Sequence, residues 1–219
     1  MKPDGTWCER AYYLVDDGST DGSDAIIAEL AERDGVRALG GTPNRGKGHA
    51  LSLGFAAAVE DGCDALIVQD ADLEYDPADM DPVLSPILDG RADAVIGTRF
   101  LGESHRVLYY WHSIANRVIT TFSNMLSNLN LTDIECGYKA FTRDVAARIT
   151  ITESRFGVEP ELVAKLAKMR LPADDAKTRP LRIYEVPISY AGRTYAEGKK
   201  IGWRDGVAAM WAIAKHNLG

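Results

Sequence analysis

The stretch Ala65-Leu66-Ile67-Val68-Gln69-Asp70-Ala71-Asp72 governs the interpretation of the whole chain. Its first five residues form the clearest predicted strand, because a short apolar run bounded by polar residues is typical of a buried strand. The run ends directly at Asp70, and Asp72 follows two positions later. A pair of carboxylates therefore stands at the end of a buried strand.

Strands and helices alternate on both sides of this stretch. The other predicted strands are Tyr12–Val15, Val36–Leu39, Ala92–Ile96 and Arg182–Val186. The predicted helices run from Ser23 or Asp24 to about Asp34, from about His49 to Glu60, and over Pro82–Leu88, Leu108–Asn130, Pro160–Met169 and Ile201–Asn217. This order predicts a single α/β domain over residues 1–219 with a mostly parallel sheet. Residues 172–180 are predicted to form an exposed loop.

Composition excludes several classes of protein. With 219 residues, 46% of them apolar, the chain is long enough to bury one sizeable core. A net charge of −7 and a pI near 5.1 argue against a nucleic-acid partner. Three widely spaced cysteines indicate a reducing cytoplasm rather than a disulfide framework. Because no run of 18 apolar residues and no signal peptide is present, we expect a cytoplasmic protein that does not span a membrane.

Asp70 and Asp72 are the leading candidates for a metal site. One extended residue between them turns both toward a common opening, and carboxylate oxygens suit Mg²⁺ or Mn²⁺. An ion bound there can bridge two phosphates and neutralise a leaving diphosphate. A lone Asp-x-Asp is weak evidence, since most random occurrences are solvated turns. Its place at the end of a strand favours the functional interpretation.

Two further loops carry residues suited to a phosphate-bearing ligand. Asp16 and Asp17 end another strand, where carboxylates can accept hydrogen bonds from a base or ribose. The sequence around them is equally a good turn, and this alternative stays open. In the loop 44–48, Arg45 and Lys47 stand at a helix start, a plausible anion site. A plain surface loop is the alternative there.

A group of donors follows the strand that ends at Ile96. Arginine matches phosphate oxygens with its forked guanidinium, so such a group suits a phosphate acceptor. The group consists of Arg99, Arg106, Ser113 and Arg117. Each of them alone is more often a surface residue than a ligand.

Taken in order, these motifs resemble the signatures of family-two glycosyltransferases. They are Val15-Asp16-Asp17-Gly18-Ser19-Thr20-Asp21, Asn44-Arg45-Gly46-Lys47-Gly48, Asp70-Ala71-Asp72 and Gly97-Thr98-Arg99-Phe100. Within that family the chain is similar to the dolichyl- and polyprenyl-phosphate mannosyltransferase and glucosyltransferase group, whose later segments match residues 132–139 and 184–188. The resemblance covers essentially all of residues 12–217.

The resemblance implies a GT-A fold, the Rossmann-like fold of nucleotide-diphospho-sugar transferases. It implies a hexose donor of the GDP-mannose or UDP-glucose class and a polyprenyl or dolichyl phosphate acceptor. The implied reaction is an inverting displacement at the anomeric carbon, driven by positioning and leaving-group stabilisation.

The resemblance also implies roles for individual residues. Donor binding falls to Asp16, Asp17, Arg45, Lys47 and Asp70. The metal would be held by Asp70, Asp72 and Glu74. Arg99, Arg106, Ser113 and Arg117 would face the acceptor phosphate. The catalytic residues would be Asp72, Arg99 and Asp133; Asp133 stands where some relatives are thought to carry a base. An acceptor phosphate is already ionised at neutral pH, so strong base catalysis is not required.

The N-terminus departs from the family pattern. Such enzymes begin with a strand ending in a Pro-x-Tyr-Asn-Glu-like motif, followed by a helix. Only residues 1–11 precede the first predicted strand here, and they contain no such motif. We therefore expect a GT-A sheet without the usual first strand and helix, and a chain that is a fragment or has a misplaced start codon. The activity of this exact chain stays open at this point.

The C-terminal stretch raises a question about membranes. Basic residues gather before a predicted helix that carries tryptophans. They are Arg193, Lys199, Lys200 and Arg204, with Trp203 and Trp211 on the helix 201–217. A basic amphipathic segment of this kind suits peripheral contact with the cytoplasmic membrane face. A helix packed on the sheet is the alternative.

Three rival functions remain from the sequence. The same family with a saccharide or another lipid as acceptor would need a base such as Asp133 to deprotonate a hydroxyl. A nucleotidyltransferase would release pyrophosphate, but no convincing signature for one is present. A truncated, inactive remnant would only bind nucleotide. The sequence identifies neither the sugar nor the nucleotide base.

Overall fold

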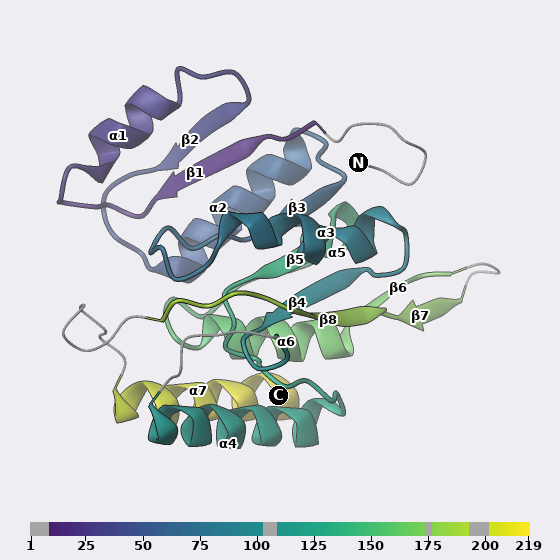
Figure 1. Cartoon of the computed structure of the whole chain (residues 1–219). Helices are drawn as coiled ribbons and strands as arrows, with labels where there is room; N and C mark the ends of the chain where they lie inside the picture. Colours follow the sequence, from purple (N-terminus) through teal and green to yellow (C-terminus); the bar gives the residue numbers. More distant parts are fainter. Residues whose placement is uncertain (1–8, 103–108, 174–176, 193–201) are drawn as a thin grey trace.

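The computed structural model describes residues 9–102, 109–173, 177–192 and 202–219. Its elements follow one another as an α/β chain (Figure 1). In chain order they are β1 (Tyr12–Asp16), α1 (Ser23–Leu30), β2 (Val36–Gly40), α2 (Lys47–Glu60), β3 (Ala65–Ile67), a 3₁₀ turn η1 (Pro77–Asp79), α3 (Met80–Leu88), β4 (Ala94–Thr98), α4 (Tyr110–Ser127), β5 (Lys139–Thr142), α5 (Arg143–Ala146), α6 (Val158–Lys168), β6 (Arg170–Pro172), β7 (Thr178–Pro180), β8 (Ile183–Pro187) and α7 (Trp203–Leu218).

The main sheet has four strands in the order β3-β5-β4-β8. Strands β4 and β8 are parallel, whereas β5 runs antiparallel to both β3 and β4. Strands β3, β4 and β8 therefore share one direction, and β5 is the reversed strand between them. The predicted α/β class with a mostly parallel sheet is confirmed, and β5 is the strand that the sequence pattern did not predict.

Strands β1 and β2 form a separate parallel pair. Among the described residues no ladder joins β1 to β3, although α2 packs against both β1 and β2. Figure 1 shows this pair and α1 at one end of the molecule.

The core lies on both faces of β4. Every residue of this strand is buried, and alternate side chains of a strand point to opposite faces. Ala94 and Ile96 belong to the cluster that contains Phe141 and Val163, while Val95 belongs to the cluster beneath α3. Helix α6 covers the first face, and α4 and α7 lie side by side beyond it (Figure 1).

The predicted loop over residues 172–180 is wrong in part. Residues 170–172 and 178–180 pair as the antiparallel strands β6 and β7. The Pro, Asp and Lys content that suggested a loop belongs to the connection between these strands and to their exposed faces. Short edge strands tolerate such residues, because proline needs no hydrogen-bonding partner on the outer side of a ladder.

Candidate active site

The loop that follows β1 holds both candidate nucleoside-binding carboxylates. Asp16 accepts hydrogen bonds from the backbone N–H groups of Gly18 (3.2 Å) and Ser19 (3.1 Å). The hydrogen bonds from Ser19 lower the pKa of this carboxyl group. Asp16 therefore forms the turn that the sequence analysis kept as its alternative, and its nucleoside role stays a prediction.

Asp17 ties the first loop to the glycine-containing loop. Its carboxylate accepts the backbone N–H groups of Arg45 (2.9 Å) and Gly46 (2.5 Å). Two of the N–H groups predicted as an anion site are thus engaged by Asp17. The Arg45 side chain remains exposed beside them. The structure brings the Asp17 and Arg45 loops together, as a shared donor site requires.

Close packing explains the glycines of this loop. A Cβ atom on Gly46 would lie 2.2 Å from the Ser154 carbonyl oxygen, and one on Gly48 would lie 1.8 Å from that of Glu153. Gly46 also has a φ of +95°, which other residues rarely adopt. The glycines therefore let the 153–154 segment approach, so the motif reflects packing as well as ligand chemistry.

Lys47 stands between two carboxylates from different elements. Its ammonium lies 2.8 Å from Asp70 and 2.7 Å from Glu159 of α6. Burial would lower the pKa of Lys47, but the charges of Glu159 and Asp70 outweigh it and raise the pKa. For Glu159, burial acts in the opposite direction and would raise the pKa. The charges of Lys47 and Lys139 outweigh burial and hold the pKa of Glu159 below its usual value.

Glu159 is a site residue that the sequence analysis missed. It lies in the first turn of α6, where an acidic residue is ordinary because it complements the helix dipole. The signal that separates it from such residues is its burial, which only the fold reveals.

Close packing and hydrogen bonds fix the Asp70–Glu74 turn. A Cβ atom on Gly137 would lie 2.5 Å from the Asp70 carboxylate, so the turn requires a glycine opposite it. Asp72 accepts the backbone N–H of Glu74 (3.1 Å), and the Tyr190 hydroxyl donates to the Glu74 carboxylate (2.9 Å). Leu73, between them, has a φ of +61° and is 92% exposed. Non-glycine residues in this conformation concentrate at functional sites.

The chemistry of these side chains fits a divalent cation. Among the described residues no three His, Cys, Asp or Glu side chains converge into a closed metal cage. Mg²⁺ does not require one, since it commonly takes one or two carboxylates and completes its shell with water and substrate phosphates. Asp70 and Asp72 supply carboxylates of that kind. The predicted metal role of these residues and Glu74 remains a proposal.

Arg99 and Asp133 form a buried pair at the carboxyl end of β4. The Arg99 guanidinium donates to both oxygens of Asp133, at 2.6 and 2.8 Å, and the Arg99 backbone N–H donates at 3.2 Å. Asn116 of α4 contacts both partners (3.3 and 3.4 Å). Asp133 is completely buried. The sequence analysis gave these two residues separate roles, but the structure places them against one another.

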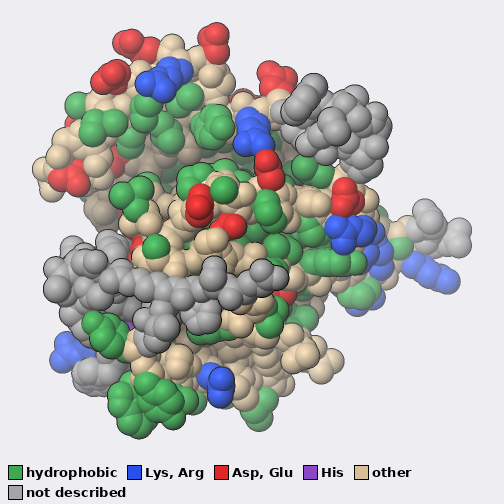
Figure 2. Space-filling view, viewed as in Figure 1, with side chains coloured by type: hydrophobic (Ala, Val, Ile, Leu, Met, Phe, Trp, Pro, Cys, Tyr) green, Lys and Arg blue, Asp and Glu red, His purple; other side chains and the backbone are tan. Residues whose placement is uncertain are grey.

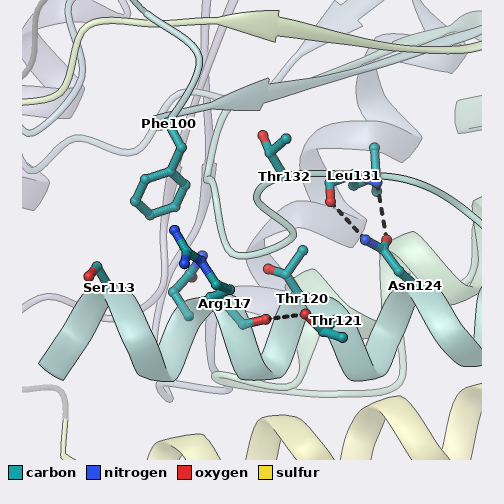
Figure 3. Close-up of a pocket in the computed structure, with 9 residues that line it drawn as sticks. Phe100, Ser113, Arg117, Thr120, Thr121, Asn124, Leu131 and Thr132 are labelled. Carbon is teal, nitrogen blue, oxygen red and sulfur yellow. Dashed lines mark hydrogen bonds between the residues drawn. The ribbon is translucent and has the colours of Figure 1, made fainter.

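A pocket of about 390 Å³ opens beside this pair, between α4 and the loops that carry Phe100 and Thr132 (Figure 3). Figure 3 shows Phe100 and Thr132 above α4, with Ser113 and Arg117 rising from the helix. The lining residues are Phe100, Ser113, Asn116, Arg117, Thr120, Thr121, Asn124, Leu131 and Thr132. Two predicted acceptor residues, Ser113 and Arg117, thus share one pocket. Arg99, another of the four, lies beside the pocket, and Arg106 lies outside the described residues.

Glu135 is a second residue that the sequence analysis did not select. Its backbone N–H donates to Asp133 (3.2 Å), and its side-chain Oε1 atom is buried without a hydrogen-bond partner among the described residues. Burial, reinforced by the charge of Glu159, raises the pKa of Glu135 to about 8. The sequence analysis placed Glu135 within the matching segment 132–139, but it could not show that the Oε1 atom of this residue is buried.

The contacts connect the two groups of predicted site residues. Lys47 contacts Asp70, Asp70 lies against Gly137, and Gly137 belongs to the same segment as Asp133. Asp133 in turn holds Arg99 beside the pocket. One end of this line offers carboxylates and a lysine, and the other offers arginines and hydroxyls. Such an arrangement suits a reaction between two phosphate-bearing molecules.

Comparison with known families agrees with this arrangement. The model of the family described as "Glycosyl transferase family 2" matches residues 5–150. The undecaprenyl-phosphate mannosyltransferase of Micrococcus luteus is 29% identical over an alignment that covers 96% of this chain and 88% of that protein. The polyprenol monophosphomannose synthase of Mycolicibacterium smegmatis is 32% identical, over 66% of this chain and 56% of that protein.

Solved structures show the same fold. The glucosyl-3-phosphoglycerate synthase of Mycobacterium tuberculosis in complex with phosphoglyceric acid superposes with a TM-score of 0.65 at 18% identity, covering 95% of this chain and 69% of that one. The same enzyme with Mn²⁺, UDP and glucosyl-3-phosphoglycerate gives a TM-score of 0.64. The GT-A-like fold expected from the sequence is therefore confirmed.

Proposed function

The chain belongs to glycosyltransferase family 2, a family of transferases, and from this premise we propose that it moves a hexose from a nucleotide-diphosphate sugar to a polyprenyl phosphate. The donor class is GDP-mannose or UDP-glucose. Two relatives that share 29% and 32% of their aligned residues with this chain are named for polyprenyl-type lipid acceptors, which supports the acceptor class.

The pocket beside Arg99 is the observation that carries this proposal. It combines the cationic side chain of Arg117 with the hydroxyl groups of Ser113 and Thr132 and the aromatic ring of Phe100. A guanidinium and hydroxyl donors match phosphate oxygens, while an aromatic wall suits a prenyl chain. A sugar acceptor alone would call for more paired amide and carboxylate groups and less apolar wall.

The proposed reaction is a single displacement. An oxygen of the acceptor phosphate attacks the anomeric carbon, and the bond from that carbon to the nucleoside diphosphate breaks with inversion. Lys47 places a positive charge beside Asp70 for the diphosphate, and Asp17 orders the loop that presents Arg45. A divalent cation held by Asp70 and Asp72, with Glu74, would neutralise charge on the leaving group.

Asp133 acts in this scheme as a positioning residue. Its two oxygens accept hydrogen bonds from Arg99, and Asn116 and the Glu135 backbone also donate to it. Both carboxylate oxygens are thus already engaged by donors of the protein. An ionised phosphate needs no base, so holding Arg99 toward the acceptor is the contribution that this geometry supports.

We further propose that the outer face of α4 and α7 rests on the membrane that holds the acceptor. On α4, Trp111, Val118 and Met125 are exposed at intervals of seven residues, so they lie along one side of the helix. On α7, Trp211 and Leu218 are exposed at an equal interval.

Helix α4 carries Arg117 and no carboxylate, which suits an anionic lipid surface, and it also lines the pocket. Figure 2 shows a patch of hydrophobic side chains over the N-terminal end of α4. No helix in the described part of the chain is long and apolar enough to span a membrane. The basic residues 193–200 that first suggested membrane contact lie outside the described residues.

Transfer to lipid tests the main proposal. The full chain, supplied with Mn²⁺, radiolabelled GDP-mannose or UDP-glucose and a short polyprenyl phosphate, should convert the label into a product that partitions into organic solvent. Transfer of label to added saccharides but not to the lipid would favour the rival acceptor class. Absence of transfer from both donors to either acceptor would overturn the proposal.

Vesicle binding tests the membrane face. Sedimentation with vesicles of phosphatidylglycerol and phosphatidylcholine should capture the wild-type chain and lose most of the Trp111→Ser, Trp211→Ser double variant. Ile26→Ser provides a matched control, because Ile26 is also an exposed apolar residue but lies on α1. Equal capture of all three proteins, or of none, would contradict membrane contact through this face.

A further inference from the structure

Glu135 is a partly buried residue that the proposed mechanism leaves unused, and the Oε1 atom of its carboxyl group is itself buried. Its Oε1 atom receives no hydrogen bond from the described residues. Such atoms are rare in folded proteins, because an unsatisfied buried polar atom loses its hydration without compensation. The other two atoms of this kind, on Ser123 and Thr142, belong to neutral hydroxyl groups, for which the loss is smaller.

Lys139 is the cation whose charge acts most strongly on Glu135, yet its ammonium group hydrogen-bonds to backbone carbonyls instead of to the Glu135 carboxyl group. The Lys139 ammonium donates to the backbone carbonyl of Ile134 (3.3 Å) and to that of Cys136. These carbonyls flank Glu135 on both sides. The fold thus fixes the backbone around Glu135 and leaves its Oε1 atom without a donor from the described residues.

The surroundings of Glu135 join the two halves of the site. Its carboxyl group interacts electrostatically with Glu159, which belongs to the Lys47 cluster, and with Arg99 and Asp133 beside the pocket. Two residues before it, Asp133 holds Arg99; two residues after it, Gly137 lies against Asp70. A sugar in transit from donor to acceptor has to occupy the region between these halves.

We propose that Glu135 hydrogen-bonds to a hydroxyl group of the transferred sugar, and that it selects the sugar rather than the nucleotide of the donor. This inference rests on the proposed function, because it requires a nucleotide-sugar in the site. A sugar presents several hydroxyl donors, and one of them supplies the partner that the Oε1 atom lacks. Because its pKa is raised to about 8, the Glu135 carboxyl group is mostly protonated at neutral pH. It can therefore also donate a hydrogen bond to a sugar oxygen.

Calorimetric titration of the full chain with Mn²⁺ separates sugar binding from nucleotide binding. Four ligands are used: GDP, GDP-mannose, UDP and UDP-glucose. Glu135→Ala should bind the nucleotide-sugar about tenfold more weakly than wild type, the value of one buried hydrogen bond, and bind the matching nucleoside diphosphate equally well. Glu135→Gln keeps an acceptor oxygen and a donor and should retain most of the affinity.

Donors lacking one hydroxyl provide a readout that does not depend on a single variant. Wild type should bind one monodeoxy donor about tenfold more weakly than the parent, whereas Glu135→Ala should no longer discriminate between the two. Thermal unfolding verifies that each variant is folded; if Glu135→Ala is not, Glu135→Leu takes its place.

The outcomes distinguish the two proposals. Unchanged discrimination in a folded Glu135→Ala or Glu135→Leu chain overturns the role of Glu135 and leaves the transferase proposal intact. Failure of wild type to bind any of the four ligands overturns both.

Discussion

Strand β4 carries a buried carboxylate–arginine cluster at each end, and the two clusters differ in what they leave available. Before the strand, Asp93 accepts hydrogen bonds from Arg179 and Arg182 at 2.6 to 3.2 Å. After the strand, Arg99 donates to Asp133 at 2.6 to 2.8 Å. Both carboxylates are almost fully shielded from solvent.

The arginines of the two clusters differ in their surroundings. Arg179 and Arg182 are partly exposed and do not line the pocket beside Arg99, and the Asp93 cluster joins β4 to the β7–β8 region. Arg99 is mostly buried, and its neighbours Phe100 and Asn116 line the large pocket. Open α/β sheets bind ligands at the carboxyl ends of their strands, and the pocket lies at that end of β4. We therefore propose that the same ion-pair chemistry serves stability at one end and ligand binding at the other.

Removal of Arg99 should give the largest effect. Arg99→Ala leaves the buried Asp133 carboxylate without its counter-charge, and we expect a loss of about 3 to 5 kcal/mol in the free energy of unfolding, with transfer to lipid abolished. Urea denaturation and the transfer assay measure the two effects. The Arg99→Met, Asp133→Leu double variant should recover most of the stability without recovering transfer. Recovery of both would show that the Arg99 pair is only structural.

Neutralisation of Asp93 should affect stability alone. Asp93→Asn loses charge-assisted hydrogen bonds from two arginines, whose side chains can then turn to solvent. We therefore expect the free energy of unfolding to fall by about 1.5 to 3 kcal/mol, while the folded protein keeps its transfer activity. Burial alone would raise the pKa of Asp93, but the hydrogen bonds from Arg179 and Arg182 hold it well below its usual range.

That lowered pKa makes the Asp93 contribution dependent on pH. It is fully present above the unfolded pKa of 3.8 and is lost as the pH falls toward the lower folded value. The difference in stability between wild type and Asp93→Asn should therefore shrink in acid. A clear fall in transfer for folded Asp93→Asn would contradict the division between the two ends.

Arg117→Ala tests the pocket at the functional end with a smaller change. Loss of one exposed cation near the acceptor phosphate should raise the KM for polyprenyl phosphate about tenfold and leave the donor KM unchanged. Steady-state kinetics with each substrate varied in turn provide the measurement. Arg148→Ala is a control on a different, exposed arginine. An equal change in both KM values would show that Arg117 does not belong to an acceptor site.

A last prediction concerns Glu135, whose pH dependence of stability should be opposite in sign to that of Asp93. The folded-state pKa of Glu135 is about 8, above the unfolded value of 4.5. Its contribution to stability is therefore present below pH 4.5 and is lost as the pH rises through about 8. Burial is the largest cause of this raised pKa; the charges of Glu159 and Asp133 add to it, and those of Lys139 and Arg99 oppose it.

Glu135→Gln removes this titration, so its stability relative to wild type should rise between pH 5 and pH 8.5, as followed by urea denaturation. A constant difference across that range would show that Glu135 is ionised in the folded protein throughout, contrary to the stated pKa.

Much of the secondary structure followed from local pattern. The apolar runs before Asp16 and Asp70 became β1 and β3, and the helices expected near Ser23, His49 and Pro160 formed within a few residues of their predicted bounds. Strand β5 was missed, because residues 139–142 mix Lys139 with apolar side chains and show no clean alternation. Its strand conformation depends on pairing with β3 and β4 on both sides.

By itself, the sequence determined the α/β class, the family resemblance and the motif residues that lie at or within a few residues of the ends of β1, β3 and β4. Local periodicity and strand-end motifs act over a few residues, and they are sufficient for these conclusions. Only the tertiary structure decided which of those residues meet. It paired Arg99 with Asp133, set Lys47 between Asp70 and Glu159, and buried the Oε1 atom of Glu135 without a hydrogen-bond partner in the described part of the chain. Burial and charge pairing depend on segments far apart in the chain, so no local pattern contains them.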